Sequence, residues 1–140
     1  YEITHRNVYT INQRVAKKFR HGRVLLAGDA AHLNNSIGGM GLNGGIHDAI
    51  NAADKIIKIW QGEADETSLD IYDIQRRTTT HEFTQAQTIA NKKRLEAKDA
   101  QTRKENLAEL KEMALDPTRA KKFMMGTSML SAVRRAATLG

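Results

Sequence analysis

The segment from Gly28 to Gly45 restricts the possible folds of this chain more than any other feature. It contains six of the ten glycines and lies between an apolar run at 23–27 and a stretch with helical periodicity. Glycine permits positive φ and lets a ligand or a second stretch of backbone approach closely. We therefore predict a strand–glycine-rich turn–helix unit, in which free N–H groups at the helix start near residues 41–43 can face negative charge.

Two short strands are predicted near the N-terminus. Residues 7–12 are rich in strand-forming side chains, and residues 23–27 form an apolar run typical of a buried strand. Two strands alone make a marginal unit, so their sheets are expected to have further members outside this chain.

The rest of the chain is predicted to be helical. Apolar residues three and four positions apart predict a helix over 46–60 with one apolar face, and Gly62 is expected to end it. Thr67 is expected to cap a second helix that extends over 69–89, with Asp70 three positions further on.

The last third of the chain is more polar. Residues 91–105 are predicted to form either a solvated helix or a mobile connection, and a short helix is expected over 107–114. Asp116 and Pro117 are typical of a helix start, with the aspartate as N-cap and the proline in the first turn. The final helical stretch is expected to present an apolar face. Its members are Phe123, Met124, Leu130 and Val133.

Composition excludes several classes of protein. Hydrophobic residues make up 40% of the chain and charged residues 27%, which is typical of a globular domain. No integral membrane segment is expected, because there is no run of about 18 apolar residues. Cysteine is absent and no two histidines are four residues apart, so no metal site is predicted. A cytoplasmic location fits these features.

Basic clusters raise the alternative of nucleic-acid binding, since the net charge is +6. Lys17, Lys18, Arg20 and Arg23 lie close together, but they are interpreted as a solvated loop before a strand. The Lys92-Lys93-Arg94 cluster is interrupted by acidic residues further along. No nucleic-acid partner is therefore predicted.

Several motifs occur in order along the first half of the chain. The run from Gly22 to His32 is followed by Gly38 to Asn43, then by Asp48-Ala49, and finally by Leu69, Tyr72 and Arg76-Arg77 at fixed spacing. The first three resemble the second flavin-binding motif of class A flavoprotein monooxygenases, the para-hydroxybenzoate hydroxylase-like enzymes, which include phenol and ubiquinone-pathway hydroxylases. The last resembles the Leu-x-x-Tyr-x-x-x-Arg-Arg stretch of that family, and upstream Tyr9, Arg14-Val15-Ala16 and Phe19 resemble its lead-in. The resemblance covers roughly residues 7–77.

The resemblance implies a fold in addition to a cofactor. The chain would be mainly α with two short N-terminal strands, as a C-terminal fragment of an α/β FAD-binding, Rossmann-like fold of the para-hydroxybenzoate hydroxylase type. Residues 1–62 would be the C-terminal part of the FAD-binding domain, and 63–140 a C-terminal helical segment. The Gly-x-Gly-x-x-Gly half of such a fold would belong to a missing N-terminal part of the same protein.

The resemblance also implies which residues contact FAD. Asp29 would bind the ribityl chain, and the backbone of Gly41, Leu42 and Asn43 would face the pyrimidine edge of the isoalloxazine. Ser36 stands where the family usually has proline. The full set of predicted cofactor contacts is Gly28, Asp29, His32, Ser36, Gly38, Gly41, Leu42 and Asn43. No catalytic acid–base or nucleophilic side chain is predicted.

The implied function is a share in an FAD- and NAD(P)H-dependent monooxygenase that hydroxylates a small aromatic or similar organic substrate. The chain alone is expected to be inactive, and homo-oligomerisation is an open expectation. Two alternatives remain at this point. One is a non-catalytic helical interaction module with a vestigial flavin loop, and the other is a flavin halogenase or reductase of the same superfamily.

Overall fold

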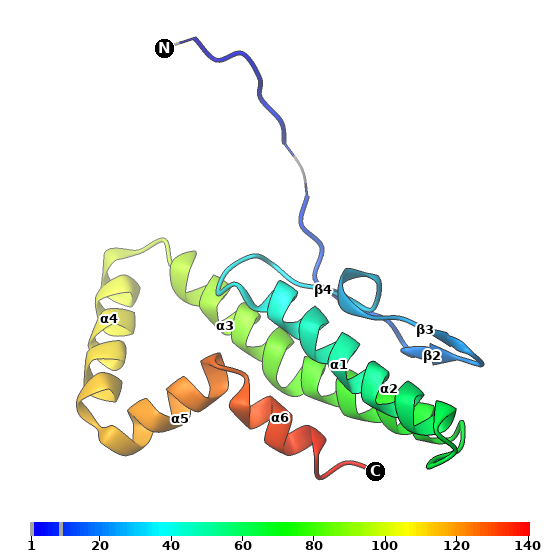
Figure 1. Ribbon diagram of the computed structural model, residues 1–140. Coiled ribbons are helices and arrows are strands. Elements are labelled where there is room, and N and C mark those ends of the chain that lie inside the picture. Colours follow the sequence, from blue (N-terminus) through cyan, green and yellow to red (C-terminus); the bar gives the residue numbers. More distant parts are fainter. Residues whose placement is uncertain (1, 9) are drawn as a thin grey trace.

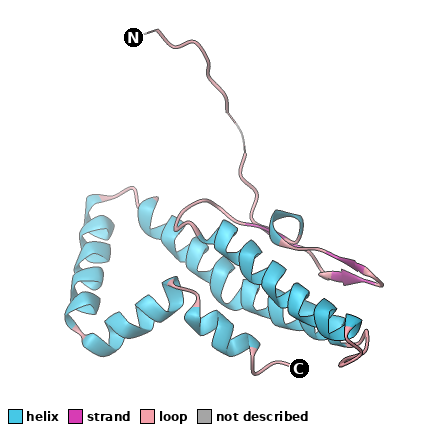
Figure 2. Ribbon diagram, viewed as in Figure 1, coloured by secondary structure: helices cyan, strands magenta, loops and turns pink. Residues whose placement is uncertain are grey.

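The computed structural model describes residues 2–8 and 10–140 and is mainly helical, as the sequence predicts (Figures 1 and 2). An extended N-terminal segment leads into two small strand pairs, and helices form the rest of the chain. The helices are α1 (Met40–Trp60), α2 (Ser68–Thr79), α3 (Ala86–Leu95), α4 (Ala100–Leu115), α5 (Pro117–Thr127) and α6 (Leu130–Ala136). A 3-10 turn, η1 (Gly28–Ala30), precedes α1, and a π-helical turn, η2 (Thr80–Gln85), joins α2 to α3. Of the described helices, none is long and apolar enough to cross a membrane.

The strands differ in position from the prediction. β1 (Arg14–Val15) pairs antiparallel with β4 (His32–Leu33), and β2 (Arg20–His21) pairs antiparallel with β3 (Val24–Leu25). The strand predicted at 7–12 is wrong for residues 7, 8 and 10–12, which form no ladder within the described part of the chain, and Tyr9 lies outside the described residues.

The apolar run at 23–27 forms one arm of a hairpin instead of a buried strand. Gly22 has a φ of 60°, which closes a two-residue loop between β2 and β3. The strand shortens to Val24–Leu25, and Val24 is 62% exposed. The expected burial of this strand is therefore wrong, because the tight turn places it at the edge of a two-stranded ribbon.

Helix α1 begins at Met40, behind Gly39 with a φ of 64°, and ends as predicted at Gly62. Gly62 has a φ of 74°, and its N–H bonds the Ile59 carbonyl at 3.1 Å. The Glu63 N–H bonds the Lys58 carbonyl at 2.8 Å, which completes a Schellman motif.

The apolar face predicted over 46–60 lies on α1, but most of it is not buried. Ile46, Ile50 and Ile57 are each about half exposed, and Trp60 is 90% exposed. The opposite side is buried, and it consists of Met40, Gly44, Asp48 and Ala52. Small residues let η1 and α2 approach this side of the helix closely, so the isoleucine stripe is left outside.

Helix α2 starts close to the predicted position, but a different side chain caps it. Asp65, not Thr67, provides the cap, since its Oδ1 accepts the Thr67 N–H at 2.8 Å. The Asp65 carbonyl accepts the Ser68 N–H at 3.2 Å. Thr67 itself already has helical backbone angles and its side chain makes no capping bond within the described residues.

The main apolar core joins α2 to α1 and the strand pairs. Phe19, Ala31, Ala52 and Tyr72 form it, all of them buried. The Tyr72 hydroxyl donates to the Leu26 carbonyl at 2.6 Å. Burial raises the pKa of Tyr72 strongly, and the negative charge of Asp48 adds to this effect. The phenol is therefore held neutral as a hydrogen-bond donor.

The C-terminal helices form an arm that leaves the main bundle and returns (Figure 1). The segment 91–105 is helical to Leu95 and again from Ala100, where α4 begins. The side chain of Asp99 caps α4 and accepts the Thr102 N–H at 2.7 Å. Asp116 caps α5 as predicted, accepting the Thr118 N–H at 2.8 Å, with Pro117 in the first turn. Helix α6 then packs against α2.

A second apolar cluster lies where α6 returns to the bundle. It consists of Met40, Met129 and Ala132, with Phe83 packed against it. The apolar face predicted for this region is largely outside, since Met124, Leu130 and Val133 are exposed. Met129 and Ala132 pack into the cluster instead, because Met129, with a φ of 61°, turns the chain between α5 and α6.

We expect Thr80→Val to leave the melting temperature unchanged or to raise it. Thr80 is 1% exposed, and its Oγ1 has no hydrogen-bond partner within the described residues. A methyl group of similar size removes that desolvation cost, which is about 1–3 kcal/mol for a buried unsatisfied group. Thr79→Val is the matched control and should lower the melting temperature, because Thr79 Oγ1 donates to the Gln75 carbonyl at 2.8 Å. Thermal unfolding followed by circular dichroism compares the two, and a larger loss for Thr80→Val would contradict this account.

Candidate functional site

The glycine-rich segment folds into a turn that lies directly against α1. Gly28 opens η1 with a φ of 59°, and its backbone touches Gly45 of α1. A Cβ placed on Gly45 would lie 3.2 Å from the Gly28 Cα, which is closer than an ordinary van der Waals contact. Glycine is favoured at Gly45 by this close approach of the two backbones, and at Gly28 by its positive φ.

A surface hollow of about 490 Å³ lies between η1 and the first half of α1. Four of the predicted cofactor contacts line it, namely Gly28, Asp29, Gly41 and Leu42. Gly45, Ile46 and Ala49 of α1 and Ala27 of the incoming chain form the rest of the wall. Asp29 and Leu42 are both exposed there, so a carboxylate and an apolar side chain face the same space.

The N-terminus of α1 contributes partial positive charge to this hollow. Within the described residues no side chain caps the helix, and its first turn contains no acidic residue. Asn43 turns its side chain back, and its Nδ2 donates to the Gly39 carbonyl at 3.2 Å. The backbone N–H groups of the first turn, which includes Gly41 and Leu42, are therefore available to negative charge.

His32 lies in the interior and not in the hollow. Its Nε2 lies 2.8 Å from Asp48 Oδ2, its Nδ1 lies 3.2 Å from Asn34 Nδ2, and its ring stacks on Phe19 with centroids 6.1 Å apart. A Cβ on Gly44 would approach the His32 ring to 3.1 Å. The imidazole thus fills the space between β4 and the glycine side of α1.

Ser36 and Gly38 belong to the loop before α1, neither lines the hollow, and Gly38 lies against α3. The Ser36 carbonyl accepts the Gly39 N–H at 3.2 Å, and its side chain is exposed. Gly38 has a φ of 103°, and a Cβ there would lie 2.7 Å from Asn91 Nδ2. Their contact with a cofactor stays a prediction.

Sequence reasoning missed the ion pair beneath the site. Asp48, fully buried on α1, accepts bonds from Arg76 Nε at 2.7 Å and from the Gly28 N–H at 2.9 Å. Burial by itself would raise the pKa of Asp48, but the hydrogen bonds from His32, Arg76 and Gly28 outweigh it and lower the pKa. The carboxylate is therefore charged and ties α1, α2, β4 and η1 together at one point.

Both members of this pair stand within the motifs of the sequence, but their contact could not be read from spacing. The signal in the sequence was that Asp48 shares one face of α1 with the small residues Gly44 and Ala52, since a charge buried on such a face requires a partner. Arg77, next to Arg76, instead pairs with Asp73 one turn earlier on the same helix at 3.1 Å.

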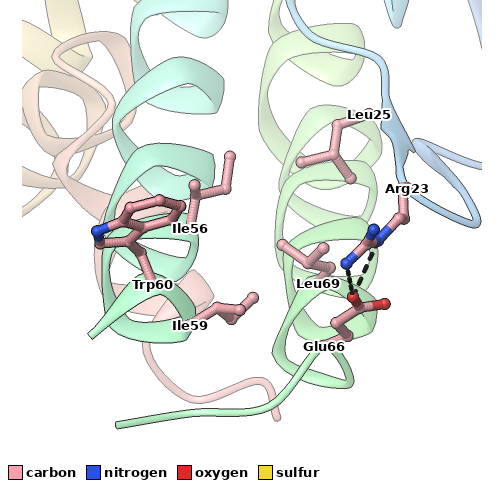
Figure 3. A pocket seen from close by; sticks show the side chains of 7 residues that line it. All are labelled: Arg23, Leu25, Ile56, Ile59, Trp60, Glu66 and Leu69. Atoms are coloured by element: carbon pink, nitrogen blue, oxygen red, sulfur yellow. Dashed lines mark hydrogen bonds and ion pairs between the residues drawn. The ribbon is translucent and has the colours of Figure 1, made fainter. Parts of the chain in front are cut away.

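A second hollow, of about 440 Å³, lies at the opposite end of α1 (Figure 3). Ile56, Ile59 and Trp60 face Leu25 and Leu69 across it. The ion pair between Arg23 and Glu66, 2.9 Å from Nε to Oε1, stands at its edge. This groove contains none of the predicted cofactor contacts, and its charged groups neutralise one another.

Comparison with known proteins shows the family of this chain. A family model described as "FAD binding domain" matches residues 1–87. Para-nitrophenol 4-monooxygenase of Pseudomonas sp. (strain WBC-3) is 38% identical over 134 residues, which cover 96% of this chain and 33% of the relative. A 3-(3-hydroxy-phenyl)propionate/3-hydroxycinnamic acid hydroxylase of Mycolicibacterium vanbaalenii is 42% identical over 91 residues, which cover 65% of this chain and 16% of the relative.

Solved structures show the same similarity. The crystal structure of p-nitrophenol 4-monooxygenase PnpA from Pseudomonas putida DLL-E4 superposes with a TM-score of 0.76 at 36% identity, over 82% of this chain and 29% of that chain. The rebeccamycin biosynthetic enzyme RebC with reduced flavin gives a TM-score of 0.60 at 26% identity, over 84% of this chain and 24% of that chain. The chain spans about a third or less of the length of these relatives.

Proposed function

This chain belongs to the FAD-binding domain family of class A aromatic monooxygenases, and on that premise we propose that it supplies one wall of the flavin site. The protein that contains it would be an FAD-dependent monooxygenase that hydroxylates a phenolic or similar aromatic substrate. Two relatives support the substrate class, because their names specify a nitrophenol and a hydroxyphenylpropionate.

The hollow between η1 and α1 is the observation that carries this proposal. It puts the Asp29 carboxylate beside a helix start that no side chain caps among the described residues. A carboxylate accepts hydrogen bonds from sugar-like hydroxyls, and free helix N–H groups stabilise negative charge on a ring edge. This combination of an acceptor carboxylate and donor N–H groups fits FAD, with Asp29 on the ribityl chain and the backbone of Gly41, Leu42 and Asn43 at the pyrimidine edge.

The residues of this chain bind and orient, and the cofactor supplies the redox chemistry. When bound, FAD would supply the coupling of NAD(P)H oxidation to oxygen activation, with the overall balance that aromatic C–H, O2, NAD(P)H and a proton give aromatic C–OH, water and NAD(P)⁺. Within this chain, Gly28 and Gly45 let η1 lie against α1 and so shape the hollow, and the α1 N-terminus would stabilise developing negative charge. No acid–base side chain of this chain is assigned to the reaction. His32, Ser36 and Gly38 would act by shaping the loop before α1.

Asp29→Asn in the intact protein tests the proposal. We expect the dissociation constant for FAD to rise about 10–100-fold, since a hydrogen bond to a charged group contributes about 1.5–3 kcal/mol. Fluorescence titration of the flavin-free protein with FAD measures this constant. Asp54→Asn is the matched control, because Asp54 is exposed on α1 and does not line the hollow.

Two results would contradict the proposal. One is a parent protein that binds no FAD at micromolar concentration. The other is an Asp29→Asn variant whose affinity equals that of the Asp54→Asn control, which would place the ribityl chain elsewhere.

A further inference from the structure

The helix that runs from Ser68 to Leu95 contains a π-helical turn, η2, in its middle. Such turns hold one residue more than an α-helical turn and occur frequently at functional sites. In this chain the turn ends at Gln85, which is buried and reaches across to the loop before α1. Its Nε2 donates to the Leu33 carbonyl at 3.1 Å and to Asn34 Oδ1 at 2.6 Å.

The extra residue brings the two halves of this helix into phase. An α-helix rotates by about 100° per residue, so in an uninterrupted helix Gln85 would lie about half a turn around the axis from Arg76. The π turn accommodates one extra residue without that extra rotation, so the angle around the axis between the two side chains is about 80°. The buried side chains therefore form one continuous face. They are Tyr72, Arg76, Thr79, Thr80, Thr84, Gln85 and Thr88. Arg76 of that face bonds Asp48 and Gly44 of α1, and Gln85 and Thr88 bond the loop at 33–35.

A chain of hydrogen bonds leads from Gln85 to the turn at Gly28. Because Asn34 Oδ1 accepts from Gln85, its Nδ2 is left to donate to His32 Nδ1 at 3.2 Å. His32 then has its ring proton on Nε2, which donates to Asp48 Oδ2 at 2.8 Å. The same oxygen accepts the Gly28 N–H. Each donor in this chain is thus directed toward the buried carboxylate.

Thr88, almost one turn after Gln85, holds the next part of the same loop. Its carbonyl accepts Asn35 Nδ2 at 3.1 Å, and its hydroxyl accepts Gln13 Nε2 at 2.9 Å. Asn35 Oδ1 in turn accepts the Ile37 N–H at 3.1 Å. Residues 33–37 are therefore fixed from one side by the helix segment that follows the π turn.

From these contacts we infer that Gln85 is a positioning residue for the flavin-binding loop, acting through Asn34, His32 and Asp48 on Gly28. It does not line the hollow and bonds none of the predicted cofactor contacts directly; its link to them runs through Asn34, which bonds His32. The inference rests on the proposed function, because it assumes that η1 and the start of α1 hold FAD. The position of η1 against the start of α1 then depends on the hydrogen bonds that the Gln85 amide donates from outside the hollow.

Gln85→Met in the intact, FAD-loaded protein tests this inference. Methionine has a similar length and no donor, so Asn34 loses the contact that orients its amide. We expect the FAD dissociation constant to rise at least tenfold and the visible circular dichroism of the bound flavin to change, with the KM for NAD(P)H unchanged. The melting temperature of the flavin-free protein should fall moderately, because the change leaves the Leu33 carbonyl and Asn34 Oδ1 without this donor, but the loss of FAD affinity should persist at temperatures well below unfolding.

Gln87→Met is the matched control on the same helix, because Gln87 bonds only Asn91 Oδ1 among the described side chains, at 2.9 Å. It should retain the parent affinity and flavin spectrum. The inference is overturned if Gln85→Met matches the parent, if Gln87→Met loses as much affinity, or if affinity falls only in parallel with the melting temperature. A parent protein that binds no FAD would instead overturn the proposed function.

Discussion

Replacing Asp48 with alanine is expected to lower the free energy of unfolding by about 3–5 kcal/mol, the range for breaking a buried ion pair from one side. The change leaves the Arg76 guanidinium buried and without its 2.7 Å partner. It also removes the acceptor of the His32 and Gly28 N–H groups. Denaturant unfolding of the intact protein, followed by circular dichroism, measures the loss.

Two further variants separate the charge from the packing at Asp48. Asp48→Ala combined with Arg76→Met removes both charges and should recover part of the lost stability, because no unpaired charge then remains buried. Glu82→Ala removes an exposed carboxylate that pairs with Arg135 at 3.0 Å, and it should cost less than about 1 kcal/mol. If Asp48→Ala costs no more than Glu82→Ala, the buried network does not stabilise the fold.

The Asp48 contribution should also depend on pH in one direction. The pKa of Asp48 in the folded chain lies below its ordinary value of 3.8. The contribution is therefore complete above 3.8 and is lost as the pH falls through the lower, folded-state pKa. The stability difference between the parent and Asp48→Asn should accordingly be constant near neutral pH and shrink in acid.

Replacing Gly45 with valine is expected to separate η1 from α1 and to weaken FAD binding at least tenfold. Even a Cβ at this position lies 3.2 Å from the Gly28 Cα, and that atom is backbone, which cannot rotate away. Overpacking of this kind costs about 1–3 kcal/mol. Titration of the flavin-free intact protein with FAD measures the affinity.

Gly126→Val provides the control for the Gly45 variant. Gly126 is also in a helix, but a Cβ there meets nothing within 4 Å. Its FAD affinity should equal that of the parent, although the same residue type has been introduced. Equal affinities for both variants would show that close contact between η1 and α1 is not required.

The sequence correctly predicted those helix ends whose capping hydrogen bonds form between residues close together in the chain. Gly62 ends α1 and Asp116 caps α5, since both bonds form within a few residues along the chain. Asp65 replaced Thr67 as the cap of α2 because two acceptors lie close together, and only the three-dimensional turn decides between them. The strand at 7–12 failed because β-propensity depends on a partner strand.

Only the local features of the candidate site could be singled out from the sequence. The glycines and Asp29 could be singled out because the turn itself is local, and four of the predicted contacts line one hollow, but their contact with FAD stays a prediction. Periodicity identified the apolar face of α1 but not what lies against it, and the chain packs the opposite side around Asp48. The pairing of Asp48 with Arg76 and the orientation of His32 arise from contacts between elements distant in sequence, which spacing along the chain does not encode.

The π turn in the long helix has a consequence for how the length of this chain could change. Because η2 absorbs one extra residue, removing one exposed residue there, such as His81, would yield an uninterrupted α-helix with both buried faces still aligned. Removal of a residue from α2 or α3 would instead rotate one face away from the glycine-rich segment by about 100°. The helix therefore has one point at which a deletion preserves its register, and related chains that are one residue shorter should show the deletion there.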